Sequence, residues 1–256
     1  MTEHDGFYVE QDEGVATITL DVPDKFNRVS MNARGELAEV FADLGSDDEV
    51  KAIVLTGRGP AFTAGGDIPG FLTRHPEELS RLAWNVAAPE RCPKPVIAKL
   101  RGYTFGVGLE LALACDFRIA ADDVELALPE IKLGMIPGSG GTQRLARLVG
   151  LGRAKDMIMR GRRISAQEAL SLGLVTEVVA QDELDDAVAS LVRELAELSP
   201  LALRTAKRVL NQVYDAPLHV GIEIEGFAYG MLRSTDDFKE GVEAFDERRK
   251  PKFEGR

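Results

Sequence analysis

Two glutamates in this chain, Glu110 and Glu130, stand where a carboxyl group could do acid–base chemistry. Glu110 lies one turn into residues 107–114, whose other positions are all apolar or glycine and predict a helix buried on every side. A carboxylate there is costly unless it is paired, or unless it stays protonated with a raised pKa. A favourable interaction with the helix dipole explains Glu110 equally well, so this stretch alone leaves both interpretations open.

Glu130 follows the apolar residues 126–128 and Pro129, and it precedes the glycine-rich residues 138–141. Taken alone, Glu130 is better explained as an exposed loop residue paired with Lys132. The glycine-rich loop could cradle a phosphate, but the signal is weak because no basic residue stands beside it.

Two further loops offer backbone amides to an anionic ligand. Small residues at positions 61–68 (AFTAGGDI) follow a predicted strand and let amides come close to a bound molecule. The alternative is an ordinary tight turn in which Asp67 caps the next helix. The second loop leads into a helix that begins near Val107, and a helix start presents unpaired N–H groups that suit an oxyanion.

Signatures of several other enzyme classes are missing. The histidines lie far apart, no Cys-x-x-Cys occurs, and Pro137 breaks a Gly-x-Ser-x-Gly pattern around Ser139. The glycines form neither a Walker loop nor a dinucleotide-binding turn. These absences disfavour triad hydrolases, zinc enzymes, NTPases and Rossmann dehydrogenases, and we expect no metal site.

The chain of 256 residues is acidic, with 42 Asp and Glu against 31 Lys and Arg and a formal net charge of −11. This balance argues against nucleic acid or an anionic membrane as a partner, because both attract basic surfaces. Cys92 and Cys115 suit a reducing compartment, and the N-terminus lacks the features of a signal peptide. No apolar run approaches the roughly 18 residues that span a bilayer. We expect a cytoplasmic protein.

Alternating strand and helix patterns must position these residues. Strands are predicted at residues 7–10, 15–20, 52–56, 96–99 and 117–120, and a helix follows the candidate cap Asn32. This alternation is typical of an α/β arrangement. The C-terminal part is helical, at residues 182–198, 200–213, 217–230 and 234–245, with candidate caps Asp182, Ser199 and Ser234. We expect this tail to pack on the core or on another subunit.

Together these stretches resemble the enoyl-CoA hydratase (crotonase) superfamily, and the resemblance runs from residue 15 to residue 253. Residues 61–68 look like the family's first oxyanion loop, residues 102–115 (GYTFGVGLELALAC) like its second, and residues 129–145 (PEIKLGMIPGSGGTQRL) like its third signature. The resemblance implies an α/β fold, a crotonase-like spiral of ββα units. It also implies a core at residues 1–195 and a C-terminal helical oligomerisation region at residues 196–256. That region would pack on the core and on neighbouring subunits of a homotrimer or homohexamer, the latter a dimer of trimers.

By position in these motifs, the resemblance makes Glu110 and Glu130 the catalytic glutamates and gives the oxyanion hole to the backbone N–H groups of Gly66 and Val107. The amide of Gly138 would position the catalytic water. Backbone at Ala64, Gly66 and Ile68 would hold the coenzyme A arm. The full set expected to contact coenzyme A or substrate is Lys25, Arg28, Ala64, Asp67, Ile68, Phe245 and Arg248.

Two positions depart from the family pattern. Arg28 replaces a small residue, and together with Lys25 it would either grip CoA phosphates or lie on the solvated surface. Val107 replaces a common glycine, so its N–H is kept while its side chain narrows the thioester site. The acyl pocket is expected at residues 69–84 and part of the C-terminal helices. The candidate lining residues, equally consistent with core positions, are Phe71, Leu72, Leu79, Leu82 and Trp84.

The resemblance implies a lyase of fatty acid metabolism, an enoyl-CoA hydratase. Such an enzyme adds water reversibly across the C2=C3 bond of a 2-enoyl-CoA thioester to give 3-hydroxyacyl-CoA. No cofactor is implied, since coenzyme A is part of the substrate. A Δ3–Δ2 enoyl-CoA isomerase on the same fold is the main alternative. The alternative from another class is a non-catalytic acyl-CoA-binding protein, and two glutamates in apolar surroundings argue against it.

Overall fold

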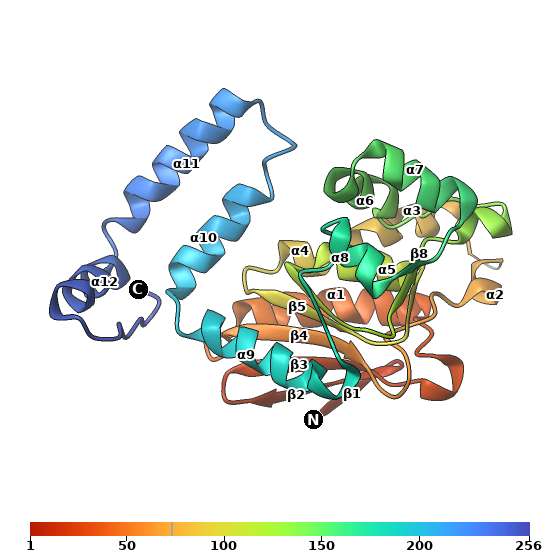
Figure 1. Ribbon diagram of the computed structural model, residues 1–256, viewed down its shortest axis with the longest axis horizontal. Coiled ribbons are helices and arrows are strands. Elements are labelled where there is room, and N and C mark those ends of the chain that lie inside the picture. The colour runs from red at the N-terminus through yellow and green to blue at the C-terminus, as the bar shows by residue number, and fades with distance from the viewer. Residues whose placement is uncertain (73) are drawn as a thin grey trace.

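Seven strands form the main sheet in the part of the chain that the structure describes (Figure 1). The structure is a computed structural model that describes residues 1–72 and 74–256 and, of Leu82, only the backbone. The first two strand pairings are antiparallel and the other four are parallel. In spatial order the strands are β1 Thr2–His4, β2 Phe7–Asp12, β3 Val15–Leu20, β4 Ala52–Gly57, β5 Val96–Leu100, β7 Phe117–Ala121 and β10 Glu177–Val179.

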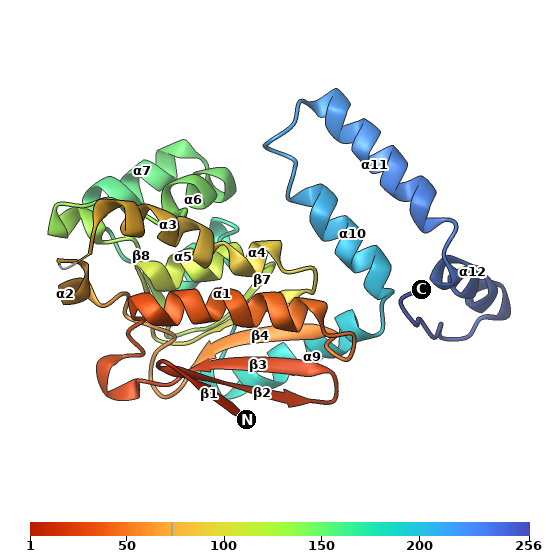
Figure 2. The same cartoon turned by 180° about the vertical axis from the view of Figure 1, so that it is seen from behind.

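The centre of this sheet is buried on both faces. Every residue of β4 is buried, as a continuous apolar run in a parallel strand predicts. Helix α1, Met31–Ser46, covers one face, and helix α9, Leu184–Ala196, covers the other, where it contacts β4, β5 and β7 (Figure 2). The predicted α/β class is therefore confirmed.

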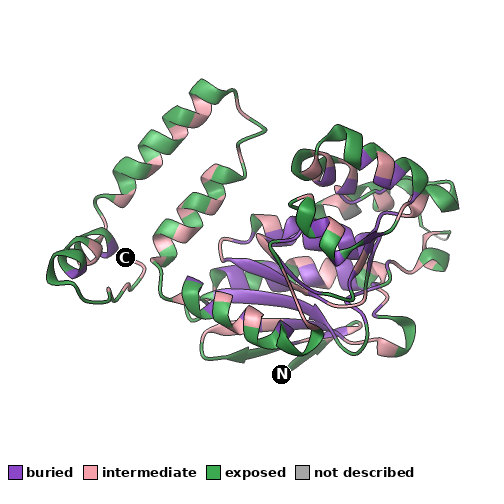
Figure 3. Cartoon of the chain, viewed as in Figure 1, coloured by how far each residue is buried: buried purple, intermediate pink, exposed green. Residues whose placement is uncertain are grey.

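A smaller sheet and the buried helix α5 complete the part that holds the site. Among the described residues this sheet has the order β6-β8-β9, with β6 Tyr103–Phe105, β8 Glu125–Ala127 and β9 Ile164–Ser165. Helix α5, Val107–Ala114, is buried at every position, as its sequence predicts, and Figure 3 shows it in the same buried region as the main sheet. The other helices of the core are α2 Ile68–Phe71, α3 Pro76–Val86, α4 Ala88–Arg91, α6 Gly141–Val149, α7 Leu151–Arg160 and α8 Ala166–Ser171, with short 3-10 helices η1 Pro23–Lys25, η2 Glu130–Leu133 and η3 Gln181–Glu183.

The N-cap of α1 is Ser30, and the prediction of Asn32 is wrong. Ser30 Oγ accepts a hydrogen bond from Ala33 N at 3.0 Å and donates one to Asp5 Oδ2 at 2.5 Å. Ser30 has extended backbone, whereas Asn32 already lies inside the first turn. The helix therefore begins two residues earlier than expected, and the Ser30 hydroxyl satisfies a free N–H group of its first turn.

Of the three caps predicted for the C-terminal helices, only Ser199 is correct; its Oγ accepts a hydrogen bond from Ala202 N at 3.2 Å. Asp182 lies in η3, and α9 begins at Leu184 without a side-chain cap bond. Thr235, rather than Ser234, caps the last helix by accepting a hydrogen bond from Phe238 N at 3.2 Å. Adjacent hydroxyl residues are equivalent as sequence signals, so only the backbone geometry separates them.

Three helices at the C-terminus extend away from the core (Figure 1), namely α10 Pro200–Leu210, α11 Leu218–Leu232 and α12 Asp236–Glu247. They expose large apolar side chains, among them Leu218, Ile222, Phe227, Tyr229 and Met231. Such a surface is typical of one that a partner covers. The division at residues 195 and 196 and the oligomeric state stay predictions. No helix among the described residues combines the length and apolar character needed to cross a membrane.

Lys207 fastens this C-terminal arm to the core. Its Nζ donates hydrogen bonds to Pro89 O at 2.8 Å, to Lys94 O at 3.0 Å and to Asp116 Oδ2 at 2.7 Å. The same Asp116 oxygen accepts a hydrogen bond from Val96 N at 2.8 Å, at the start of β5. One largely buried ammonium group therefore joins α10 to the start of β5, an inner strand of the main sheet.

We expect Lys207→Met to lower the free energy of unfolding by about 3 kcal/mol, because it leaves the Asp116 carboxylate and two carbonyl groups without their cation. Urea unfolding at neutral pH measures the change. Arg208→Met removes the same charge from an exposed position on the same helix and should change stability by less than about 0.5 kcal/mol. Equal losses in the two variants would contradict the role given to Lys207.

Candidate active site

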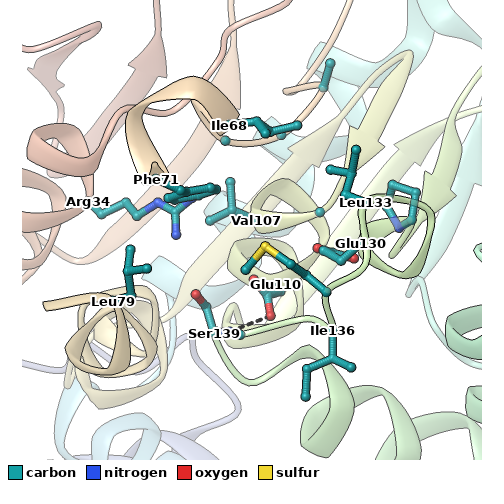
Figure 4. A pocket seen from close by; sticks show the side chains of 17 residues that line it. Arg34, Ile68, Phe71, Leu79, Val107, Glu110, Glu130, Leu133, Ile136 and Ser139 are labelled. Atoms are coloured by element: carbon teal, nitrogen blue, oxygen red, sulfur yellow. Dashed lines mark hydrogen bonds between the residues drawn. The ribbon is translucent and has the colours of Figure 1, made fainter. Parts of the chain in front are cut away.

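A cavity of about 170 Å³ brings together the three stretches singled out in the sequence (Figure 4). It lies at the N-terminal end of α5, beside the loop at residues 64–68, helix α3 and residues 129–139. Its walls are mostly apolar, and polar groups reach it from a few positions only. The side chains that Figure 4 labels are Arg34, Ile68, Phe71, Leu79, Val107, Glu110, Glu130, Leu133, Ile136 and Ser139.

The first two loops are held side by side by a short parallel pairing. Thr63 N donates to Tyr103 O, and Phe105 N donates to Thr63 O, each at 3.0 Å. Helix α5 approaches Thr63 so closely that a Cβ added at Gly108 would lie 2.5 Å from Thr63 Cγ2. Glycine at position 108 therefore allows the start of α5 to meet the first loop.

This pairing places the backbone of Gly66 and of Val107 on one cavity, as predicted. Within the described residues, neither N–H group has a hydrogen-bond acceptor. Val107 occupies the first position of α5, where N–H groups are free and the helix dipole is positive. The two amides are therefore available as donors to an anionic oxygen.

Glu110 is a buried carboxyl group, with 2% of the residue exposed. Its Oε1 accepts hydrogen bonds from Ser139 N at 2.7 Å and Gly141 N at 3.0 Å (Figure 4 marks the first). Burial raises the pKa of Glu110, while these amides and the charge of Arg34 oppose the rise. The glycine-rich loop thus cradles the chain's own carboxylate, and the prediction of a phosphate cradle is not what the structure shows.

Glu130 begins η2 and faces the same cavity. Burial raises the pKa of Glu130 to about 7; the charge of Glu110 adds to the rise and Arg34 opposes it. Its Oε2 is buried without a hydrogen-bond partner in the described part of the chain. Lys132 makes no ion pair with it there, so the interpretation as an exposed, paired loop residue is wrong. The turn of η2 directs this side chain inward, which sequence spacing alone does not show.

Arg34 is a cavity residue that the sequence analysis did not identify. It is 5% exposed, and its Cζ lies 5.4 Å from the centre of the Phe71 ring. The sequence does carry a signal for the burial of Arg34, because position 34 falls on the same helical face as the buried Leu37 and Phe41. A charged residue on a core-facing stripe is unusual and merits a functional explanation.

The residues expected to hold coenzyme A are only partly gathered here. Ala64, Ile68 and Gly138 line the cavity. Arg28 Nη1 instead lies 3.0 Å from Asp67 Oδ1, so Asp67 makes an ion pair and gives no side-chain cap to α2. Lys25 is exposed at the end of η1. Contact of Lys25, Arg28 and Asp67 with coenzyme A stays a prediction.

Phe245 and Arg248 lie at the end of α12, on the C-terminal arm and away from the cavity of the same chain (Figure 1). Phe245 is 84% exposed and lies in a separate hollow between the C-terminal helices. One chain alone therefore does not bring these two residues to the site, and their contact with coenzyme A stays a prediction.

Of the residues predicted to line the acyl pocket, Phe71 and Leu79 line this cavity, and its occupation by an acyl group stays a prediction. Leu72 and Trp84 are exposed, and Trp84 packs beside Arg91 instead. The side chain of Leu82 lies outside the described residues. No C-terminal helix lines the cavity of the described chain, whereas three apolar residues of the third stretch do so unexpectedly, namely Leu133, Met135 and Ile136.

Over residues 1–72 and 74–256, no group of three or more His, Cys, Asp or Glu side chains is placed to hold an ion. The cavity itself offers two carboxyl groups, one guanidinium group and free backbone amides. These groups suit proton transfer and the binding of an anionic oxygen.

A family model described as enoyl-CoA hydratase/isomerase matches residues 10–256. The short-chain-enoyl-CoA hydratase of Clostridium acetobutylicum is 36% identical over 247 residues, which cover 94% of this chain and 95% of that protein. The mitochondrial methylglutaconyl-CoA hydratase of Rattus norvegicus is 36% identical, over 96% of this chain and 81% of that protein. The crystal structure of an enoyl-CoA hydratase from Bacillus anthracis superposes with a TM-score of 0.92 at 37% identity, over 98% of this chain and all of that one.

The raised pKa of Glu130 makes stability depend on pH. The folded chain binds this proton more tightly than the unfolded chain, so the stabilisation is full at low pH and is lost as the pH rises through about 7. We expect Glu130→Gln, which cannot ionise, to melt above the wild type by a margin that grows from about pH 5 to about pH 8.

Thermal unfolding across that range measures the margin. Glu39→Gln removes the same charge from an exposed position on α1 and serves as the control. A Glu130→Gln melting temperature that stays parallel to the wild type at every pH would overturn the expected proton linkage.

Proposed function

This chain belongs to the enoyl-CoA hydratase/isomerase family, the crotonase superfamily, and we infer that it is an enoyl-CoA hydratase, a hydro-lyase that adds water reversibly across the C2=C3 bond of a 2-enoyl-CoA thioester. The observation that carries this conclusion is the meeting of two carboxyl groups and two free backbone amides on one apolar cavity. A protein that only binds acyl-CoA has no need for two desolvated glutamates.

The amides of Gly66 and Val107 receive the negative charge that builds on the thioester oxygen as the substrate becomes enolate-like. A donor of this kind is typically worth about 2.7–4 kcal/mol in the transition state. The amides need no rearrangement for this role, because the pairing between the two loops already holds them on the cavity.

Glu110 orients and activates the water that attacks C3. Hydrogen bonds from Ser139 N and Gly141 N fix the direction of its carboxylate and favour its ionised form. The amide of Gly138, next to these donors on the same loop, helps to position the water. A base that is held rigidly against its substrate is an efficient one.

Glu130 exchanges a proton with C2. With a pKa of about 7 it is partly protonated at neutral pH and can act as the acid of the hydration and the base of the reverse reaction. Because the charge of Glu110 raises the pKa of Glu130, the two groups titrate as a coupled pair. Their different surroundings divide the acid and base roles.

Coenzyme A binding, assembly and compartment complete this proposal. Five side chains contact coenzyme A, namely Lys25, Arg28 and Asp67 of the core and Phe245 and Arg248 of the arm. The three basic side chains among them act locally, against the overall charge of −11. The exposed apolar faces of α10–α12 join chains into a homotrimer or a homohexamer. Two buried free cysteines, Cys92 and Cys115, suit the cytoplasm.

We expect Glu110→Gln and Glu130→Gln each to lower kcat for hydration at least about a hundredfold with KM little changed, because each removes proton transfer and keeps the shape of the cavity. Steady-state rates with crotonyl-CoA measure the effect. Glu39→Gln, on the exposed side of α1, is the matched control and should keep the wild-type rate. Near-normal kcat in either site variant would remove that glutamate from the mechanism.

The isomerase alternative is tested in water labelled with oxygen-18. Hydration places the solvent oxygen on C3 of the product, whereas movement of a double bond between C3=C4 and C2=C3 adds no water. We expect label at C3 after incubation with a 2-enoyl-CoA. An unlabelled product, formed together with fast conversion of a 3-enoyl-CoA, would assign the chain to the isomerases.

A further inference from the structure

One charged group in the cavity has no part in the hydration scheme above, and that is the guanidinium of Arg34. Its side chain is almost fully buried, and Nε has no hydrogen-bond partner in the part of the chain that the structure describes. Figure 4 shows the group inside the cavity, beside Phe71 and directed towards Val107. A buried N–H group without an acceptor is costly, so an acceptor that enters the cavity and reaches Nε would relieve this penalty.

The two catalytic glutamates do not serve as that partner. Over the described residues, no hydrogen bond or ion pair joins the Arg34 side chain to either of them, and both act on it only through space. Glu110 Oε1 is occupied by the amides of Ser139 and Gly141. The guanidinium therefore keeps its N–H donors for a bound molecule.

The position of Arg34 indicates which part of the substrate it meets. A Cβ added at Gly66 would fall 2.5 Å from Arg34 Nη2, so the guanidinium lies against the first oxyanion loop. It also stacks on Phe71, an acyl-pocket residue. Arg34 therefore faces the same cavity that Gly66, Val107 and the apolar side chains of Phe71 and Leu79 line.

We propose that Arg34 binds a carboxylate carried by the acyl group, so that the preferred substrate is a 2-enoyl-CoA made from an unsaturated dicarboxylic acid. The planar guanidinium offers paired N–H donors that match the two oxygens of a carboxylate. The apolar walls around Phe71 and Leu79 hold the carbon chain between the two charged ends. A neutral acyl chain offers the guanidinium no hydrogen-bond acceptor. This proposal rests on the hydratase function inferred above.

The test compares crotonyl-CoA with glutaconyl-CoA, which differs by a carboxylate in place of one hydrogen on C4. We expect the wild type to hydrate glutaconyl-CoA with a kcat/KM at least about tenfold higher. Arg34→Met should lower kcat/KM for glutaconyl-CoA at least about tenfold more than it lowers kcat/KM for crotonyl-CoA, because both substrates share its effect on the glutamates and only glutaconyl-CoA loses a carboxylate partner. Arg34→Lys keeps the charge but not the paired N–H donors, so its kcat/KM for glutaconyl-CoA should lie between those of the wild type and Arg34→Met.

Arg101→Met is the matched control. Arg101 also has a buried Nε without a partner among the described residues, but it lies outside the cavity. It should leave the preference between the two substrates unchanged.

Two results would overturn the proposal. If Arg34→Met slowed both substrates equally, the guanidinium would act on the shared thioester chemistry. If the wild type preferred crotonyl-CoA, the carboxylate would have no site. Should Arg34→Met fail to fold, wild-type calorimetry with glutaryl-CoA and butyryl-CoA decides, since the proposal requires at least about tenfold tighter binding of glutaryl-CoA. A wild type that hydrates no 2-enoyl-CoA at all would refute the hydratase function itself.

Discussion

The buried carboxylate of Glu110 is the group on which the rest of the site depends. An ionised group inside an all-apolar helix needs donors, and the chain supplies them from the loop that opens α6. That loop must come very close, since a Cβ added at Gly141 would lie 3.0 Å from Glu110 Cγ and Oε1. The third stretch of the sequence is therefore tied to the second by one carboxyl group, and this contact shapes the floor of the cavity.

Three charged groups share the cavity, and each one changes the others. Arg34 favours ionisation of both glutamates, whereas Glu110 raises the pKa of Glu130. Because the walls are apolar, these interactions act in a medium of low polarity, where charges separated by a few ångströms remain strongly coupled. The raised pKa of each glutamate is thus a property of the set, and a change to any one of the three residues shifts the other two.

Sequence reasoning predicted the parts of the site that carry a local signature. Glu110 stood out because its neighbours on the helix are all apolar or glycine, and small residues before a helix start indicated two loops with available amides. The choice of Gly66 and Val107 within those loops, and the catalytic role of Glu110, came from the family resemblance. Glu130 could not be placed from its own surroundings, because the turn of η2 decides where it points. Arg34 was overlooked because its neighbours fitted an ordinary amphipathic helix, and Asn32 was preferred to Ser30 because two polar residues competed for one cap. These errors concern direction and register, which depend on tertiary contacts.

The bond network around Lys207 bears on how this fold can change over evolution. The arm extends away from the core, yet the ammonium group of Lys207 satisfies a carboxylate and two carbonyl groups near the start of the inner strand β5. Asp116 also holds the start of β5, the strand whose far end leads into the second oxyanion loop. Removing or exchanging the arm would therefore leave the Asp116 carboxylate and the carbonyl groups of Pro89 and Lys94 without this hydrogen-bond donor. A different arm would therefore keep the stability of the core only if it again placed a cation beside Asp116.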